Sequence, residues 1–403
     1  MKTAAYPATK EDASGGIIAR WLQRLDRRVN VGRLEIRLPN GEEVLLSGSS
    51  DLDIKADWRV HSWRALRRVV ARGAIGFAEG YVAGDWDTSN LTALILFAGR
   101  NEDNFDGLGT GNRLSRLIDR LMHQRNRNSK LGSKRNIAFH YDLGNDFYRA
   151  WLDETMSYSA GVFKDPSVSL AASQVEKMDR LLRVLDLRRE HRLLEIGCGW
   201  GGFLEHSAAK VGCPATGISI SAEQIAFARE RLASGGLDAQ VLFKDYRDLD
   251  GSFDRIASIE MFEAVGEAYW PLFANNIKRL LSPQGVAAMQ FITIEDSRFE
   301  AYRQTPDFIQ RYIFPGGMLP SLPRFKDVMN DAGLKVTDQF SFGRDYAQTL
   351  AHWRERFLDA WPDIANDKFD EHFKRLWLYY LGYCEAGFHA NRIDVVQVRL
   401  EHA

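Results

Sequence analysis

Three closely spaced glycines are the part of the chain best suited to hold a ligand. Gly197, Gly199 and Gly202 directly follow the apolar run 193–196. A strand that passes through a glycine-rich turn into a helix lets the backbone approach a cofactor closely, and the first N–H groups of the helix offer hydrogen bonds. The spacing fits a dinucleotide as well as S-adenosylmethionine, so the turn alone does not choose between them.

Polar residues on the neighbouring strands favour S-adenosylmethionine. The expected strand 215–220 carries Ser219 near its end, with no carboxylate where a dinucleotide enzyme usually binds a ribose. Glu195 suits the first strand of a methyltransferase, and Asp245 with Tyr246 end a third strand with an acid and an aromatic ring that could hold adenine. The alternative is that the glycines serve only to turn the chain.

Length and composition set the outer limits. A chain of 403 residues with 45% hydrophobic content is expected to fold into two domains, and a net charge of −1 argues against broad electrostatic capture of nucleic acid. The three cysteines lack metal-ligand spacing, which favours a reducing cytoplasm and no metal site. No long uncharged apolar stretch is present, so contact with a membrane is expected to be peripheral.

The N-terminal part is expected to form a small α+β domain over residues 16–110, after a disordered stretch at 1–15. Alternating apolar residues predict strands, and apolar residues at helical spacing predict helices. The expected elements are strands at 33–38 and 44–46, a helix around 63–70, a glycine- and aromatic-rich loop from 73 to 87, and a helix at 91–97.

Residues 111–135 form a basic connecting segment. Eight basic residues accompany a single acid, Asp119, and the first half also carries apolar residues at helical spacing. Such a basic amphipathic helix lies on anionic lipid surfaces. A solvated linker between domains is an equally good interpretation. The basic residues are Arg113, Arg116, Arg120, Arg125, Arg127, Lys130, Lys134 and Arg135.

The remaining residues, 136–403, alternate between strand and helix patterns. This order predicts a parallel sheet with crossover helices. Ser221 and Gln224 predict a capping box at the start of a helix. The segment 373–383 predicts a very aromatic helix in this domain, and 395–400 a closing strand that forms a hairpin edge of the same sheet.

Several motifs resemble the cyclopropane fatty acid synthases. The resemblance rests first on 140–146, 195–202 and 261–266, and it extends over nearly the whole chain. It implies an α/β fold with a Rossmann-like class I methyltransferase domain behind a smaller N-terminal α+β domain. The implied activity is transfer of a methyl group from S-adenosylmethionine to the double bond of an unsaturated acyl chain in a membrane phospholipid. The further matching segments are 80–81, 84–86, 244–249, 312–317, 342–346 and 357–362.

The same resemblance implies roles for individual residues and for the whole protein. His140 and Tyr141 would line a lid over the reacting methyl group, although His140 could equally be a buried structural histidine. Ser219 and Gln224 could equally be helix-cap residues. A homodimer on the cytoplasmic face of the phospholipid bilayer is expected, with no nucleic-acid partner. The residues implied for the cofactor are Tyr158, Ser159, Gly197, Gly199, Ser219, Gln224, Asp245 and Tyr246.

The chain departs from the family where a proton must be removed. In the family a bound bicarbonate is thought to take this proton, held by a cysteine, a glutamate, a histidine, a tyrosine and a backbone group. Glu263 and Tyr346 keep the glutamate and the tyrosine, but Ala160 stands for the cysteine and Gln290 for the histidine. Half of the anion's ligands are gone, so the sequence does not support a complete bicarbonate site.

These substitutions predict that methyl transfer is kept and that deprotonation has changed. Loss of a proton from a neighbouring chain carbon would leave a methylated alkene or a methylene group instead of a ring. Glu263 is the candidate base or carbocation stabiliser and Tyr346 its hydrogen-bonding partner, with a structural polar pair as the alternative. The sequence leaves two other functions open, namely a lipid-binding protein without catalysis and a methyltransferase for a soluble small molecule.

Overall fold

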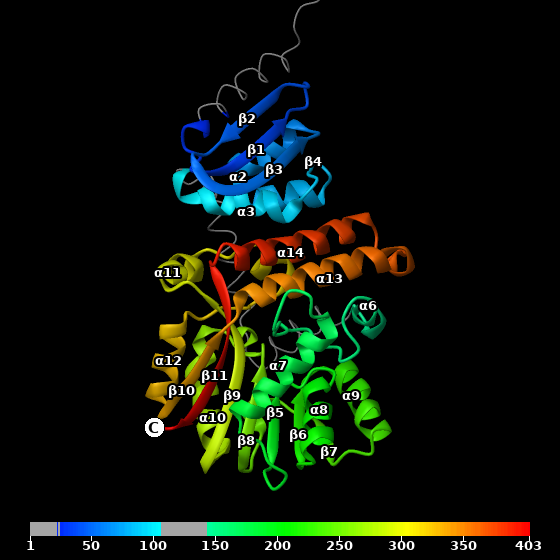
Figure 1. Cartoon of the computed structure of the whole chain (residues 1–403), viewed down its shortest axis with the longest axis vertical. Helices are drawn as coiled ribbons and strands as arrows, with labels where there is room; N and C mark the ends of the chain where they lie inside the picture. Colours follow the sequence, from blue (N-terminus) through cyan, green and yellow to red (C-terminus); the bar gives the residue numbers. More distant parts are fainter. Residues whose placement is uncertain (1–21, 23–24, 106–142) are drawn as a thin grey trace, which may run out of the picture. The chain divides into compact units, whose positions relative to one another are not determined.

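The chain folds into two compact units. The computed structural model describes residues 22, 25–105 and 143–403 (Figure 1). The first unit contains the described residues up to 105 together with Asp367–Ala390, and the second contains those from 143 to Asn366 together with Asn391–Ala403. Among the described helices, none is both long and apolar enough to span a bilayer. The expected disordered stretch 1–15 and basic segment 111–135 lie outside the described residues.

The first unit is built on a four-stranded sheet in the order β2-β1-β3-β4. The strands predicted at 33–38 and 44–46 are confirmed as β1 (Val31–Arg37) and β2 (Glu43–Ser47), which form an antiparallel hairpin. The sequence pattern did not indicate β3 (Ser50–Val60), which runs parallel to β1, or β4 (Trp86–Asp87), which is antiparallel to β3.

The predicted loop from 73 to 87 is wrong, because most of it is helical. Helix α2 (Trp63–Val82) runs through Gly73, where φ of 59° and ψ of −135° kink it without ending it. Beyond the kink, Ile75, Ala78 and Tyr81 are buried at helical spacing, so packing outweighs the poor helix propensity of the glycines. Helix α3 (Leu91–Asn101) is confirmed and slightly longer than predicted.

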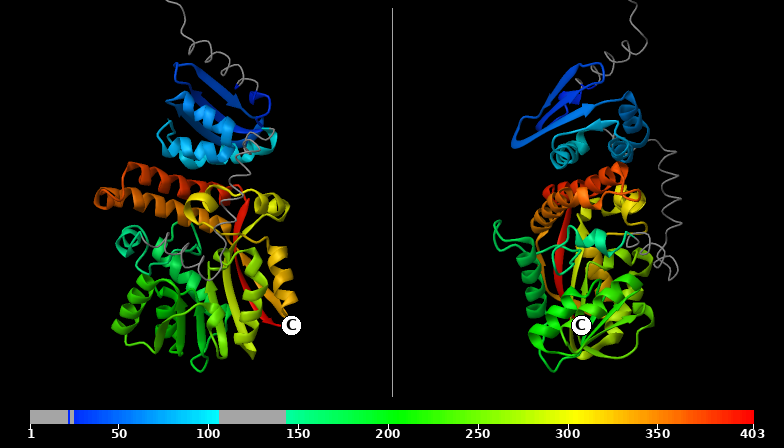
Figure 2. Two further views of the ribbon diagram at one scale, coloured as in Figure 1. Left: turned by 180° about the vertical axis from the view of Figure 1, so that it is seen from behind. Right: turned by 90° about the vertical axis from the view of Figure 1, so that its right-hand side faces the viewer.

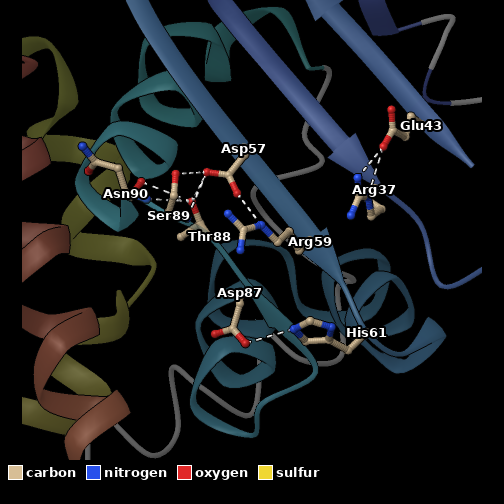
Figure 3. A network of polar contacts seen from close by, with 9 residues as sticks. All are labelled: Arg37, Glu43, Asp57, Arg59, His61, Asp87, Thr88, Ser89 and Asn90. Carbon is tan, nitrogen blue, oxygen red and sulfur yellow. Dashed lines mark hydrogen bonds and ion pairs between the residues drawn. The ribbon is translucent and has the colours of Figure 1, made fainter. Parts of the chain in front are cut away.

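Asp57 on β3 stabilises the turn that leads into α3 (Figure 3). Its carboxylate accepts hydrogen bonds from the Ser89 backbone and from the Ser89 and Thr88 hydroxyls, and it pairs with Arg59 at 2.9 Å. Burial alone would raise the pKa of Asp57, but the hydrogen bonds from Ser89 and the charge of Arg59 lower it overall. Asn90 then caps α3 by accepting from the Ala93 N–H.

Helix α14 (Glu371–His389) corrects the expected range 136–403 for the second domain. The helix predicted at 373–383 is present, but it belongs to the first unit. Its Arg375 donates to the carbonyl oxygens of Tyr81 and Trp86 at 2.5 and 2.8 Å and lies 4.1 Å from the ring centre of Tyr81. These contacts tie a segment from late in the chain to the end of α2.

We expect the substitution Arg375→Ala to destabilise the first unit by about 2–4 kcal/mol, because two carbonyl groups and a cation–π contact lose their partner. The matched control is Arg37→Ala, since Arg37 forms an exposed ion pair with Glu43 and about 0–1 kcal/mol is expected there. Urea unfolding of the full chain measures both. Equal losses for the two variants would contradict the anchoring role.

The second unit is an α/β structure around a seven-stranded sheet in the order β10-β11-β9-β8-β5-β6-β7. The five strands from β5 to β9 run parallel, as the alternating pattern predicted. Their bounds are β5 (Leu193–Ile196), β6 (Ala215–Ser219), β7 (Ala239–Phe243), β8 (Phe253–Ile259) and β9 (Leu281–Ile294).

Helices cover both faces of this sheet (Figures 1 and 2). Two separate apolar clusters lie against it, one including residues of α10 and α12 and the other residues of α7, α8 and α9. The described α-helices of this unit are α6 (Asn145–Arg149), α7 (Leu170–Val184), α8 (Gly202–Val211), α9 (Ala222–Ser234), α10 (Trp270–Leu280), α11 (Asp296–Gln304), α12 (Leu322–Asp331) and α13 (Gly343–Ile364).

The closing strand is confirmed, but its predicted place at the edge of the sheet is wrong. Strand β11 (Ile393–His402) lies between β9 and β10 (Leu334–Ser341) and pairs antiparallel with both. The edge is therefore β10, which the sequence pattern did not indicate. Val396, Val398 and Leu400 of β11 are fully buried, which fits an interior strand.

Candidate functional site

The glycine-rich turn joins β5 to α8 as predicted. Gly197 and Gly199 adopt left-handed φ values of 80° and 51°, which residues with a Cβ atom rarely adopt. A Cβ on Gly197 would stand 2.8 Å from Met261 Cγ, whereas a Cβ on Gly199 would meet only Gln224 Nε2, at 3.9 Å. The turn therefore has an open side at Gly199, and its backbone can come close to a ligand there.

The second strand supplies Ser219 and the start of α9. Ser221 caps α9 by accepting from the Gln224 N–H, so the predicted cap is confirmed. The Gln224 side chain completes no capping box, because its Oε1 accepts from the Ser219 hydroxyl at 3.1 Å. This bond leaves the Gln224 amide nitrogen on the open side of Gly199, where it can donate to a ligand.

Asp245 and Tyr246 follow β7, at the same carboxyl-terminal edge of the sheet. The Asp245 carboxylate accepts two hydrogen bonds from Arg247, at 2.8 and 2.7 Å, so its charge is already balanced within the chain. The Tyr246 ring packs edge-on against Phe273 at 5.2 Å, and burial raises the pKa of its hydroxyl to about 12. Of the two, the Tyr246 ring is better suited to contact a flat base.

Ser159 lies beside a buried lysine on α7. Lys177 Nζ donates to the Ser159 hydroxyl at 2.7 Å and to Gln174 Oε1 at 2.5 Å. Burial lowers the pKa of Lys177 to about 8, although Glu260, Asp153 and Glu195 act in the opposite direction. Burial likewise raises the pKa of Glu195 to about 8, which Lys177 opposes. The glycine turn thus lies near a buried lysine and a buried carboxyl group whose pKa values are shifted toward the neutral forms.

Glu260 is at the centre of the polar cluster, and sequence reasoning missed it. Its Oε1 accepts from the Ala160 N–H at 2.9 Å and from Gln290 Nε2 at 2.8 Å, and its Oε2 accepts from the Tyr346 hydroxyl at 2.6 Å. Gln397 donates to Gln290 Oε1 at 2.9 Å, which orients the amide so that its nitrogen faces Glu260. Three of the positions singled out in the sequence therefore converge on one carboxylate.

The expected pairing of Glu263 with Tyr346 is wrong, because the tyrosine hydroxyl bonds to Glu260. Glu263 Oε1 instead accepts from the Ile292 N–H at 2.5 Å, and its Oε2 is buried with no hydrogen-bond partner in the described part of the chain. Burial and the nearby charge of Glu260 raise the pKa of Glu263 to about 8. At neutral pH Glu263 therefore keeps its proton.

Aromatic rings form one wall of this region. The Tyr158 ring lies 5.2 Å from Trp353, 5.5 Å from Tyr148 and 5.6 Å from Trp151, all measured between ring centres. The Tyr346 ring meets Trp353 edge-on at 6.1 Å, so the wall continues to the Glu260 carboxylate. Aromatic faces attract cations and exclude water, which suits both a sulfonium and a positively charged carbon.

The residues present fit S-adenosylmethionine. Gly199 and Gln224 offer an open backbone and an amide donor, Tyr246 offers a ring, and Tyr158 offers an aromatic face for a sulfonium. Met261, which directly follows Glu260 after β8, closes one side of the turn, because a side chain at position 197 would collide with it. His140 and Tyr141, expected in the lid, lie outside the described residues.

Known proteins are similar to this chain in both sequence and fold. The family model described as mycolic acid cyclopropane synthetase matches residues 128–398. Tuberculostearic acid methyltransferase of Mycobacterium tuberculosis is 39% identical over 360 residues, which is 84% of this chain and 81% of that protein. Cyclopropane-fatty-acyl-phospholipid synthase of Escherichia coli is 35% identical over 360 residues, covering 88% of this chain and 89% of that protein.

Two solved structures show the same relationship. The structure of a cyclopropane synthase from Mycobacterium tuberculosis is 29% identical, with a TM-score of 0.62, and covers 66% of this chain and 97% of its own. A mycolic acid cyclopropane synthase crystallised with SAH and CTAB is 30% identical, with a TM-score of 0.61 and the same coverage.

Proposed function

Because the chain belongs to the cyclopropane fatty acid synthase family, we propose that it methylates the double bond of an unsaturated acyl chain in a membrane phospholipid and yields a product that stays unsaturated. It is a methyltransferase, and its cofactor is S-adenosylmethionine. Its relatives are lipid-modifying methyltransferases. The observation that carries the proposal is an aromatic wall that ends at a charged, hydrogen-bonded carboxylate.

The wall suits a reaction that develops positive charge on an apolar chain. When bound, S-adenosylmethionine supplies a methyl group that the π electrons of a double bond attack, which leaves a carbocation on the acyl chain. The half-buried Tyr158 ring, backed by the fully buried Trp353, offers a face that attracts this charge, by about 2 kcal/mol or more where water is excluded. They also keep out water, which would trap the cation as an alcohol.

The ligand set for proton removal supports an unsaturated product. Ala160 contributes only its backbone N–H, and Gln290 is held by Gln397 and bonded to Glu260, so neither side chain brings a charge. A proton acceptor that is part of the protein stands at a different place from a small bound anion. The place of the acceptor relative to the carbocation decides which hydrogen of the acyl chain is removed as a proton. Loss from a chain carbon gives a methyl-branched alkene, and loss from the methyl group after a hydride shift gives a methylene group.

An isotope experiment tests the product. We expect incubation of the protein with dioleoyl phosphatidylglycerol vesicles and S-adenosylmethionine carrying a CD₃ group to give labelled acyl chains that ozone cleaves. Mass spectrometry counts three retained deuterium atoms for a methyl-branched alkene and two for a methylene group. A labelled chain that resists ozone is a saturated ring and would overturn the proposed product. No label in lipid, with the cofactor bound in calorimetry, would favour a protein that only binds lipid.

Two further expectations stay predictions. Peripheral attachment to the cytoplasmic face of the membrane follows from the family resemblance and from the basic segment 111–135, and a homodimeric state follows from the resemblance alone. Vesicle sedimentation and analytical ultracentrifugation of the full chain measure them directly.

A further inference from the structure

The backbone at Glu260 is held in a conformation that residues other than glycine rarely adopt. Glu260 follows directly after β8 and has a φ of 47°, in the left-handed region. Its N–H donates to the Gln290 carbonyl at 2.7 Å, which fixes this turn against β9. Strained positions of this kind persist where the surroundings hold them, and they are concentrated at active sites.

The Glu260 carboxylate is held in place from three directions. Its donors come from the segment before α7, from β9 and from α13, namely Ala160 N, Gln290 Nε2 and Tyr346 Oη. These are the positions at which the family resemblance expects the cysteine, the histidine and the tyrosine of the anion site. Here the three donors bind a side chain of the protein itself. Because that carboxylate uses all three, no donor in this set is left for a separate anion.

Burial and the neighbouring groups shift the pKa of Glu260 in opposite directions. Lys177 is the nearby cation and Glu263 the nearby carboxyl group, and Glu263 holds its proton at neutral pH. Burial raises the pKa of Glu260 above its ordinary value, although hydrogen bonds from Tyr346, Ala160 and Gln290 oppose the rise. The residue as a whole is half-buried, and its carboxylate is enclosed by the three donors. A carboxylate with a raised pKa is a better proton acceptor than one in water.

We infer that Glu260 is the built-in base of the reaction and that its carboxylate makes an external anion such as bicarbonate unnecessary. This inference rests on the proposed function. In the step, one oxygen of the Glu260 carboxylate takes a proton from a carbon next to the cationic centre, and the two electrons of that C–H bond form the new π bond. The chain becomes neutral, Glu260 becomes a carboxylic acid, and it returns the proton to water before the next turnover.

The test compares variants with and without bicarbonate, using dioleoyl phosphatidylglycerol vesicles and methyl-labelled S-adenosylmethionine. We expect the unaltered protein to be equally active in bicarbonate-free buffer and after bicarbonate is added. Glu260→Gln is expected to lower kcat by about 100-fold or more, the usual effect of removing a general base. Glu260→Gly removes the carboxylate and opens its place, so added bicarbonate or formate is expected to restore part of the activity.

Controls separate this inference from loss of folding and from failure of the proposed function. Asp179→Asn removes another partly buried carboxylate of the same unit, one that pairs with His206 and Lys210, and it is expected to keep full activity. Calorimetry with S-adenosylmethionine shows whether each variant still folds and binds. An unaltered protein that depends on bicarbonate, or a Glu260→Gln variant that keeps its rate, would overturn the role of Glu260. Absence of methyl transfer by the unaltered protein would instead refute the proposed function.

Discussion

Replacing Gly197 with alanine is expected to weaken S-adenosylmethionine binding by about 10- to 100-fold, which is about 1.4–2.8 kcal/mol. Alanine at a φ of 80° costs about 1–2 kcal/mol, and its Cβ would stand 2.8 Å from Met261 Cγ. The turn can relieve both only by shifting, and a shift moves the backbone that approaches the cofactor. Isothermal titration calorimetry measures the loss.

A matched glycine separates this effect from a general loss of stability. Gly212 ends α8 at a φ of 71°, and the nearest atom to an added Cβ is Arg189 Nε at 4.0 Å. Gly212→Ala therefore has a similar backbone cost at the opposite end of the same helix. We expect it to lower the melting temperature and to leave cofactor affinity unchanged. If both variants lose affinity equally, the turn at Gly197 has no special part in binding.

The sequence was most informative where structure depends on neighbouring residues. The turn after β5, the Ser221 cap of α9 and the hairpin of β1 and β2 follow from glycine spacing, a capping hydroxyl and alternation over a few positions. Each of these features can be recognised from the residue types of one short stretch of sequence. They could therefore be predicted without knowledge of the overall fold.

Predictions failed where distant packing decides the outcome. The apolar face of α14 predicts a helix, but the sequence does not show that this face packs in the first unit with α2 and α3. The glycine-rich sequence from Gly73 onward predicted a loop. The buried residues that follow Gly73 instead keep the chain helical beyond a kink. The place of β11 between β9 and β10 likewise depends on pairing over long sequence distances.

The candidate site shows the same division. The residue types at 160, 263, 290 and 346 could be identified from the family resemblance, but the carboxylate on which three of them converge could not. Glu260 is 100 residues from Ala160 and 86 residues from Tyr346, so only the folded chain brings them together. A carboxylate directly after a buried strand, at the edge where parallel strands end, was the available signal.

Substituting Tyr346 with phenylalanine is expected to lower kcat by about 10- to 100-fold at neutral pH, the equivalent of one hydrogen bond to a charged group. The Tyr346 hydroxyl stabilises the ionised form of Glu260, so its removal raises the pKa of that carboxylate further. The base must be ionised to accept a proton. The acid limb of the pH–rate profile is therefore expected to move to higher pH by about 1–2 units, and much of the activity should return above it.

The pH profile distinguishes this effect from simple loss of packing. Phenylalanine keeps the edge-on contact with Trp353 and loses the hydroxyl that donates to Glu260, so affinity for S-adenosylmethionine should be unchanged. Lys177 and Glu263 titrate near pH 8 in the unaltered protein too, and its profile is the reference for their contribution. Tyr302→Phe, which removes a hydroxyl near Leu319, is expected to leave the profile unmoved. A lower kcat for Tyr346→Phe with an unshifted acid limb would mean that the hydroxyl only supports the fold, because a base that had lost its hydrogen bond must hold its proton more tightly.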